Sequence, residues 1–251
     1  MLSASASNIS LAIILLICSY LIGAIPFGVL FGKLICGKDI RKYGSKNIGT
    51  TNTIRVLGKK VGFTVFFFDV LKGALMIIII KYILEPFNIW QSPIPHLSYG
   101  LAAIIGHTFS IYLDFKGGKG VATSLGVVLA LTPIPAVLCL ICFVIVLYST
   151  GYVSLASTGA TLTVLISAWI LHFVGISSEN VSFLGWLIGK PDIFTEICYS
   201  LMGVLILLKH IKNYKRLMAG TENSFKKSKQ WCLLFYYVFY VFHHIISNVI
   251  A

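Results

Sequence analysis

Long apolar segments constrain what this chain can fold into more than any other feature of its sequence. A helix needs about 20 residues to cross a hydrocarbon core about 30 Å thick. The apolar segments cover approximately residues 9–35, 61–84, 96–114, 121–132, 134–150, 156–174, 193–210 and 231–250. Only 11% of the residues are charged, compared with roughly 25% in soluble domains, and the strand alternation of a membrane β-barrel is missing. The sequence therefore predicts an all-α, polytopic membrane protein.

The distribution of basic residues indicates how these segments are arranged. Seventeen of the 20 lysines and arginines fall in three clusters, Lys33–Lys60, Lys116 with Lys119, and Lys209–Lys229. Pro133 and Pro135 favour a turn, because proline removes a backbone donor; one long kinked helix over 121–150 is the alternative. With the turn, seven spans precede Lys209 and all three clusters share one face. The positive-inside rule favours that arrangement, with cytoplasmic clusters and an external N-terminus.

The two ends of the chain lead to separate expectations. Residues 1–32 carry no charged side chain, so the basic region of a cleaved signal peptide is missing and the first span is expected to remain. Trp231–Ile250 is long enough for an eighth span, although its aromatic residues also suit a helix that lies in the headgroup region. We expect a membrane-integral domain over residues 1–225, a seven-helix bundle, followed by an extra hydrophobic segment over 226–251.

A nucleic-acid-binding role for the basic residues and a redox or metal-binding role for the cysteines fit the sequence less well. The net charge of +12 could attract nucleic acid, but the basic residues flank apolar spans, and membrane topology accounts for them. Cys139 and Cys142 have the spacing of a redox or metal pair. They lie in an apolar run without a second pair, which favours two small helix residues. Histidines and carboxylates do not cluster at ligand spacing. We expect no metal, no cofactor and no nucleic-acid partner.

The loop at residues 44–55 has the composition of an anion-binding site. It combines glycines with hydroxyl, amide and guanidinium groups, among them Ser45, Asn47, Asn52 and Arg55. A phosphate or carboxylate needs convergent donors of this kind. Serine, threonine and asparagine also favour helix caps, so a solvated loop that caps the next helix fits the same residues.

A second loop, residues 115–123, places glycines between lysines directly before a helix. Its residues of interest are Lys116, Gly117, Gly118, Lys119 and Gly120. Glycines let backbone N–H groups approach an anion closely, and the helix N-terminus adds a partial positive charge. The spacing is not that of a Walker A loop. The pattern favours anion binding.

Polar residues three positions apart occur in two later segments. Ser154 and Ser157 share a helix face, where small hydroxyl residues also serve ordinary packing between membrane helices. His210 and Asn213 share a face at the end of the seventh span and could reach one ligand, although a histidine among lysines is often simply solvated. By itself the serine pair favours packing, whereas His210 and Asn213 fit either interpretation.

Asp69 and Lys72 place opposite charges inside the second span. An unpaired charge at membrane depth costs about 2.5–3.5 kcal/mol, so we expect the two side chains to pair with each other. Lys72 could also extend towards the cytoplasm. His107, in the third span, is expected to bond another helix.

Five motifs, in this order and in matching membrane positions, resemble the membrane-integral acyl-phosphate:glycerol-3-phosphate acyltransferase family of bacteria. The resemblance covers residues 10–225, and its motifs are Gly44–Gly58, Phe68–Gly73, Gly106–Thr123, Tyr152–Ser157 and His210–Glu222. The family implies a seven-helix bundle in the bacterial inner membrane with a cytoplasmic site. It also implies transfer of a fatty acyl group from acyl phosphate to the sn-1 hydroxyl of glycerol 3-phosphate. The products would be 1-acyl-glycerol 3-phosphate and phosphate, the first committed step towards phosphatidic acid.

By resemblance, the motif residues bind the two substrates. The family implies that glycerol 3-phosphate is held by Ser45, Arg55, Lys116, Ser154, His210 and Asn213. The glycine loop would bind acyl phosphate, and the remaining motif positions are Asn47, Asn52, Lys119, Ser157 and Glu222. His210, Ser154 and Asn213 are the expected catalytic residues. His210 would orient or deprotonate the hydroxyl, unless a phosphate oxygen of a substrate is the base.

The sequence departs from the family pattern at Lys46, Thr50, Ser110 and Lys209, and it continues beyond Glu222. The four substitutions are peripheral to the reaction, whereas the segment after Glu222 is a larger difference, because family members usually end near that position. A transporter of phosphate-containing anions is the alternative function. It would prefer polar sites at the membrane midplane and two related halves, whereas these motifs gather at one face without a repeat. A non-catalytic scaffold would tolerate substitutions in the loops.

Overall fold

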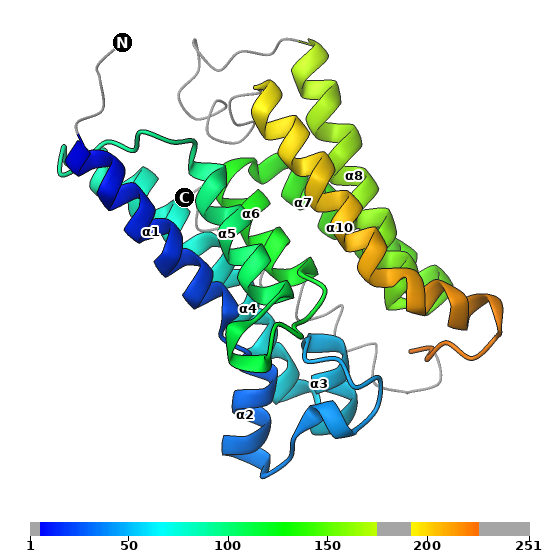
Figure 1. Ribbon diagram of the computed structural model, residues 1–251. Helices are drawn as coiled ribbons and strands as arrows, with labels where there is room; N and C mark the ends of the chain where they lie inside the picture. Colours follow the sequence, from blue (N-terminus) through cyan, green and yellow to red (C-terminus); the bar gives the residue numbers. More distant parts are fainter. Residues whose placement is uncertain (1–5, 175–191, 226–251) are drawn as a thin grey trace, which may run out of the picture.

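The described part of the chain is a bundle of helices (Figure 1). The computed structural model describes residues 6–174 and 192–225, and all regular elements in these two stretches are helical. The predicted all-α membrane fold is confirmed. The hydrophobic segment Trp231–Ile250 lies outside the described residues.

Five of the described helices are long and apolar enough to cross a membrane. They are α1 (Ala6–Ala24), α4 (Lys59–Ile79, continued by a π-helical turn at Ile80–Leu84), α7 (Pro133–Thr150), α8 (Val153–Val174) and α10 (Ile193–Met218). Two others, α5 (His96–Thr108) and α6 (Val121–Leu131), are shorter. These seven helices correspond to the seven predicted spans, although α5 and α6 do not reach spanning length as helices alone.

The predicted hairpin around the two prolines is confirmed. Helix α6 ends at Leu131 and α7 begins at Pro133, with Thr132 between them. Proline is tolerated at the first position of a helix, where its missing N–H would have no helical partner. The Thr132 hydroxyl shares a 2.9 Å hydrogen bond with the Tyr199 hydroxyl of α10. The turn is therefore attached to a neighbouring span.

The first apolar segment is divided into two helices, which corrects the prediction of one continuous span. Helix α1 stops two residues before Pro26, which lacks a backbone donor and clashes with the preceding turn. Side chains from other segments satisfy the carbonyls at the break. Ser110 Oγ donates to the Ala24 carbonyl at 2.6 Å, and Lys72 Nζ donates to the Ile25 carbonyl at 2.9 Å.

The helices pack in two groups that lie side by side in Figure 1. Helix α4 packs against α5 and α6, and α1 packs against α5, while α8 packs against both α7 and α10. Two short helices, α2 (Phe27–Cys36) and α3 (Thr50–Leu57), lie at the lower end of the view. Small residues permit close approach of membrane helices. A Cβ atom at Gly23 would overlap the backbone of Ala103 on α5.

The charges inside α4 pair with each other, as predicted. Lys72 Nζ lies 2.7 Å from Asp69 Oδ1, and both side chains are nearly inaccessible to solvent. His107 of α5 brings its Nδ1 atom to 3.7 Å from the same carboxylate oxygen. The pair thus links α4 to the break after α1 and to the C-terminal turn of α5.

Lys72→Met is expected to destabilise the fold by about 3–5 kcal/mol, because it leaves the Asp69 carboxylate buried without its cation. Thermal unfolding of the detergent-solubilised protein measures this effect. The double variant Asp69→Leu with Lys72→Met is the control, since replacing both members of a buried ion pair is often nearly neutral. An unchanged unfolding temperature for Lys72→Met would contradict the structural role of the pair.

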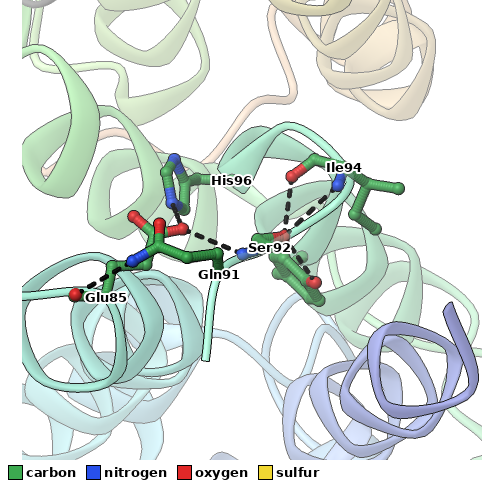
Figure 2. Close-up of polar contacts among 6 residues, drawn as sticks. Glu85, Gln91, Ser92, Ile94 and His96 are labelled. Carbon is green, nitrogen blue, oxygen red and sulfur yellow. Dashed lines mark hydrogen bonds and ion pairs between the residues drawn. The ribbon is translucent and has the colours of Figure 1, made fainter. Parts of the chain in front are cut away.

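The connection between α4 and α5 lies at the opposite end of the bundle from α3 (Figure 1), and polar contacts fix it in place (Figure 2). Glu85 Oε1 lies 2.9 Å from His96 Nε2 and accepts the Ser92 N–H at 3.2 Å. Gln91 Nε2 donates to the Glu85 carbonyl at 3.0 Å. These contacts hold the start of α5, whose other end carries His107 towards the glycine loop.

Candidate active site

The loops that carry the sequence motifs lie at one end of the bundle, the lower end in Figure 1. This end contains α2, α3, the α5–α6 connection, the start of α8 and the end of α10. Segments that are far apart in the sequence therefore meet there. The geometry of each segment is set by its own local contacts.

Asn52 organises the loop before α3. Its Nδ2 group donates to the carbonyls of Ile40 and Tyr43 at 3.1 Å and of Asn47 at 2.9 Å, and its Oδ1 atom accepts the Ser45 N–H at 2.8 Å. The side chain is buried. Both ends of this amide are thus occupied within the protein, so Asn52 positions the loop.

Asn47 has a similar local role at the start of α3. Its Oδ1 atom accepts the N–H of Gly49, the N-cap residue of the helix, at 2.9 Å. This bond closes an Asx turn that leads into α3, whose start carries no side-chain capping bond. Ser45 is half-buried and Arg55, in the last turn of α3, is exposed. Lys46 of the same loop is exposed as well.

The glycine loop packs tightly against the end of α5. The N–H of Gly117 donates to the Thr108 carbonyl at 3.2 Å, and the N–H of Gly118 donates to the His107 carbonyl at 3.0 Å. A Cβ atom at Gly117 would overlap that His107 carbonyl oxygen, and one at Gly118 would overlap the His107 ring. Glycine is required here for close packing.

This geometry corrects the expectation that the loop glycines direct their N–H groups towards an anion. Gly117 and Gly118 direct theirs inward. The first turn of α6 offers further donors, because its N–H groups lack carbonyl partners within the helix. Gly120, with φ +80°, is the N-cap residue of α6. A helix start of this kind can bind an anion.

The two lysines of this loop have different surroundings. Lys116 is exposed, whereas Lys119 is half-buried and its Nζ atom donates to Asn213 Oδ1 at 2.6 Å. Burial lowers the pKa of the Lys119 ammonium to about 8, an effect that the negative charge of Glu222 opposes and that Arg216 reinforces. Lys119 therefore connects the glycine loop to α10.

Glu222 is the centre of a hydrogen-bond network across three segments. Its Oε1 atom accepts from Asn213 Nδ2 at 2.7 Å and from Ser154 Oγ at 3.4 Å, and its Oε2 atom accepts from Arg216 Nε at 2.7 Å. The carboxylate thus joins α8, α10 and the segment after α10. Through Asn213 the network continues to Lys119.

His210 is held in one tautomer by its own helix. The Ile206 carbonyl, which can only accept, lies 2.8 Å from His210 Nδ1, so Nδ1 carries the proton and Nε2 keeps a lone pair. The ring stacks on Tyr214, whose hydroxyl shares a 2.6 Å hydrogen bond with Thr158 of α8. A neutral imidazole with a free Nε2 lone pair can accept a proton.

The structure brings most of the predicted residues to one end of the bundle, but their side chains differ in burial and in hydrogen bonding. Ser154 and Ser157 are both buried on α8, and only Ser154 bonds to Glu222 among the contacts found in the described residues. The charges of Lys119 and Glu222 act on His210, and that of Glu222 acts on Arg55. Hydrogen bonds join Lys119, Asn213 and Glu222 directly, and Arg55 lies over the ring of Phe225, three residues after Glu222.

Arg216 was not among the site residues predicted from the sequence. It lies three residues after Asn213, so the helical spacing would have placed it on the same face. The roles of Tyr214 and Thr158 depend on contact between two helices, which no local pattern indicates. Cys139 and Cys142 are free cysteines of α7, as expected.

Comparison with known proteins identifies the family. The family model described as glycerol-3-phosphate acyltransferase matches residues 13–220. The chain belongs to this family. It is 45% identical over 223 residues to the glycerol-3-phosphate acyltransferase of Acholeplasma laidlawii, covering 86% of this chain and 94% of the relative. The enzyme of the same name from Macrococcus caseolyticus is 43% identical, with coverage of 86% and 98%.

Solved structures of the family have the same fold. The crystal structure of PlsY (YgiH), an integral membrane glycerol 3-phosphate acyltransferase, in its glycerol 3-phosphate form matches with a TM-score of 0.70 at 37% identity. That match covers 85% of this chain and 95% of the crystallised one. The lysophosphatidic acid form matches with a TM-score of 0.68 at 36% identity, covering 85% and 94%. The resemblance identified from the motifs is confirmed.

Proposed function

We propose that this protein transfers a fatty acyl group from acyl phosphate to the sn-1 hydroxyl of glycerol 3-phosphate. The products are 1-acyl-glycerol 3-phosphate and inorganic phosphate, and the reaction begins phospholipid synthesis. The observation that carries the proposal is the network from Lys119 through Asn213 to Glu222 and Ser154. It joins three family motifs at one end of a membrane bundle, where an amphipathic and a soluble substrate can meet.

The cations of the site suit two phosphorylated substrates. We assign glycerol 3-phosphate to Ser45, Arg55, Lys116, Ser154, His210 and Asn213. The acyl phosphate belongs at the glycine loop, beside Lys119 and the start of α6, where the helix terminus favours an anion. Cationic groups lower the repulsion between the two substrates and stabilise charge that develops on the leaving phosphate. Asn47, Asn52 and Glu222 hold these groups in place, and we assign Ser157 to the same site by its motif position.

The chemical step requires no enzyme-bound intermediate, because acyl phosphate is already an activated mixed anhydride. The sn-1 oxygen attacks the acyl carbon, the bond from that carbon to the bridging oxygen breaks, and phosphate leaves with the electron pair. The hydroxyl proton passes to a base. His210 Nε2 has the required lone pair, since Nδ1 donates to Ile206; a substrate phosphate oxygen is the alternative base.

We infer a multi-pass location in the bacterial inner membrane with this site on the cytoplasmic side. The support is the gathering of the basic clusters at one end of the bundle, since cytoplasmic loops carry an excess of lysine and arginine. The same gathering favours interfacial chemistry over transport, for which a site at the midplane would be expected.

Phosphate release by the purified full-length protein tests this function. Palmitoyl phosphate is supplied with and without glycerol 3-phosphate, and the lipid product is identified by mass. We expect release that depends on glycerol 3-phosphate, together with equimolar lysophosphatidic acid. Binding of both compounds without product would overturn the enzyme assignment and favour the transporter.

Lys119 should make the reaction sensitive to alkaline pH. The ammonium is protonated below its pKa of about 8 and neutral above it, so binding of acyl phosphate weakens as pH rises. Between pH 7 and pH 9, kcat/KM for palmitoyl phosphate should fall by about tenfold, as one group with that pKa requires. Lys119→Arg should remove this decline, because arginine keeps its charge. The control is Lys38→Arg, the same change at an exposed lysine. An identical pH profile of kcat/KM for Lys119→Arg and wild type would exclude Lys119 as the source of the decline.

A further inference from the structure

The chain reverses direction after α10 and returns across the end of the bundle. Residues 219–225, here called the return segment, begin with a turn at Gly220, which has φ +65°. The Thr221 N–H donates to the Arg216 carbonyl at 2.8 Å. The return segment carries Glu222 into the site, and it lies below α10 in Figure 1.

The return segment ends on Phe225, which contacts Arg55 of the first motif and Gly151, the residue directly before the Tyr152–Ser157 motif. Its N–H donates to the Gly151 carbonyl at 2.8 Å, three residues before Ser154. Its ring is only 8% exposed. The guanidinium carbon of Arg55 lies over this ring, 5.3 Å from its centre. Phe225 thus lies between α3 and the start of α8.

The position of the ring suits a guanidinium that must bind phosphate. Among the described residues, no carboxylate lies within ion-pair distance of Arg55. An aromatic ring attracts the face of a guanidinium by about 0.5–2 kcal/mol. It leaves the N–H groups at the edge of that plane free for a bidentate contact. A carboxylate partner would instead compete with the phosphate for those donors.

We propose that Phe225 is a positioning residue that holds Arg55 ready for the phosphate of glycerol 3-phosphate. The inference rests on the proposed function. Phe225 lies beyond residues 13–220, which the family model matches. The return segment therefore contributes two groups to one substrate site: Glu222 orders Asn213 and Arg216, and Phe225 orders Arg55.

The test compares Phe225→Leu and Phe225→Tyr in the full-length protein. Leucine keeps an apolar side chain and the N–H bond to Gly151 but removes the ring. We expect Phe225→Leu to raise KM for glycerol 3-phosphate by about three- to tenfold, with kcat, KM for palmitoyl phosphate and the unfolding temperature near wild type. Phe225→Tyr retains the ring and should restore the wild-type KM. Phe173→Leu, the same change at an exposed ring on α8, is the control.

The outcomes separate this inference from the proposed function. If the wild-type protein shows no turnover in this assay, the proposed function is contradicted, and the result does not depend on the variants. With active wild type, an unchanged KM for glycerol 3-phosphate in Phe225→Leu would overturn the role of Phe225. An equal loss for both substrates, or a lower unfolding temperature, would assign Phe225 to the fold alone and would also overturn it.

Discussion

His210→Ala is expected to lower kcat by about 10²- to 10⁴-fold, the usual contribution of a positioned general base. His210 lies on α10 beside the network of Asn213 and Glu222, and its Nδ1 proton is fixed by the Ile206 carbonyl at 2.8 Å. The variant removes the Nε2 lone pair from the site. Single-turnover transfer from palmitoyl phosphate, at saturating glycerol 3-phosphate, measures the loss in the chemical step.

His210→Asn separates proton transfer from packing. Asparagine can place a donor near the position of Nδ1 and keep the bond to Ile206, but it lacks a basic lone pair in place of Nε2. A loss as large as that of alanine, in a protein with wild-type unfolding temperature, would support His210 as the base. Near-normal turnover in the asparagine variant would instead leave proton transfer to a substrate phosphate oxygen.

Gly117→Ala should have the second large effect, a fall in kcat/KM of about 100-fold or more. The added Cβ atom would overlap the backbone oxygen of His107, which cannot move without α5. The glycine loop must shift instead, and it carries Lys119 away from Asn213. Misplacement of a catalytic group by about 1 Å can cost 100-fold in rate. Initial rates with both substrates varied measure this loss.

Gly203→Ala on α10 is the matched control. Its new Cβ atom would meet a side-chain methyl of Leu165 at 3.0 Å, and a methyl group can move where a backbone carbonyl cannot. We expect this variant to retain most of its activity. Wild-type kinetics in Gly117→Ala would contradict the tight packing of the glycine loop on α5.

Local patterns were sufficient for the membrane architecture. Hydropathy predicted the spans because transfer into lipid depends on the composition of about 20 consecutive residues. Pro133 and the basic clusters predicted the hairpin between α6 and α7. Asp69 and Lys72 were predicted to pair because they are neighbours on one helix and a lone charge is costly in lipid. Motif order identified the family.

The tertiary structure decided what each motif residue does. Asn52 and the N–H groups of the glycine loop have the chemistry of anion ligands, yet their donors bond within the protein. No sequence pattern distinguishes these outcomes, because the competing carbonyls become neighbours of these donors only when the loop folds back on itself or packs on α5. The same holds for Lys119, whose partner Asn213 is 94 residues away.

The sequence by itself determined that this chain forms a helical membrane bundle and which residue types gather at one end. Both follow from local composition, because the insertion of each segment depends on its own apolar residues and its orientation depends on the basic residues of the adjacent loops. Only the tertiary structure determined that Glu222 joins three motifs and that Phe225 supports Arg55. Those contacts depend on how the chain returns after α10, and the path of a turn is set by the surfaces on which it packs.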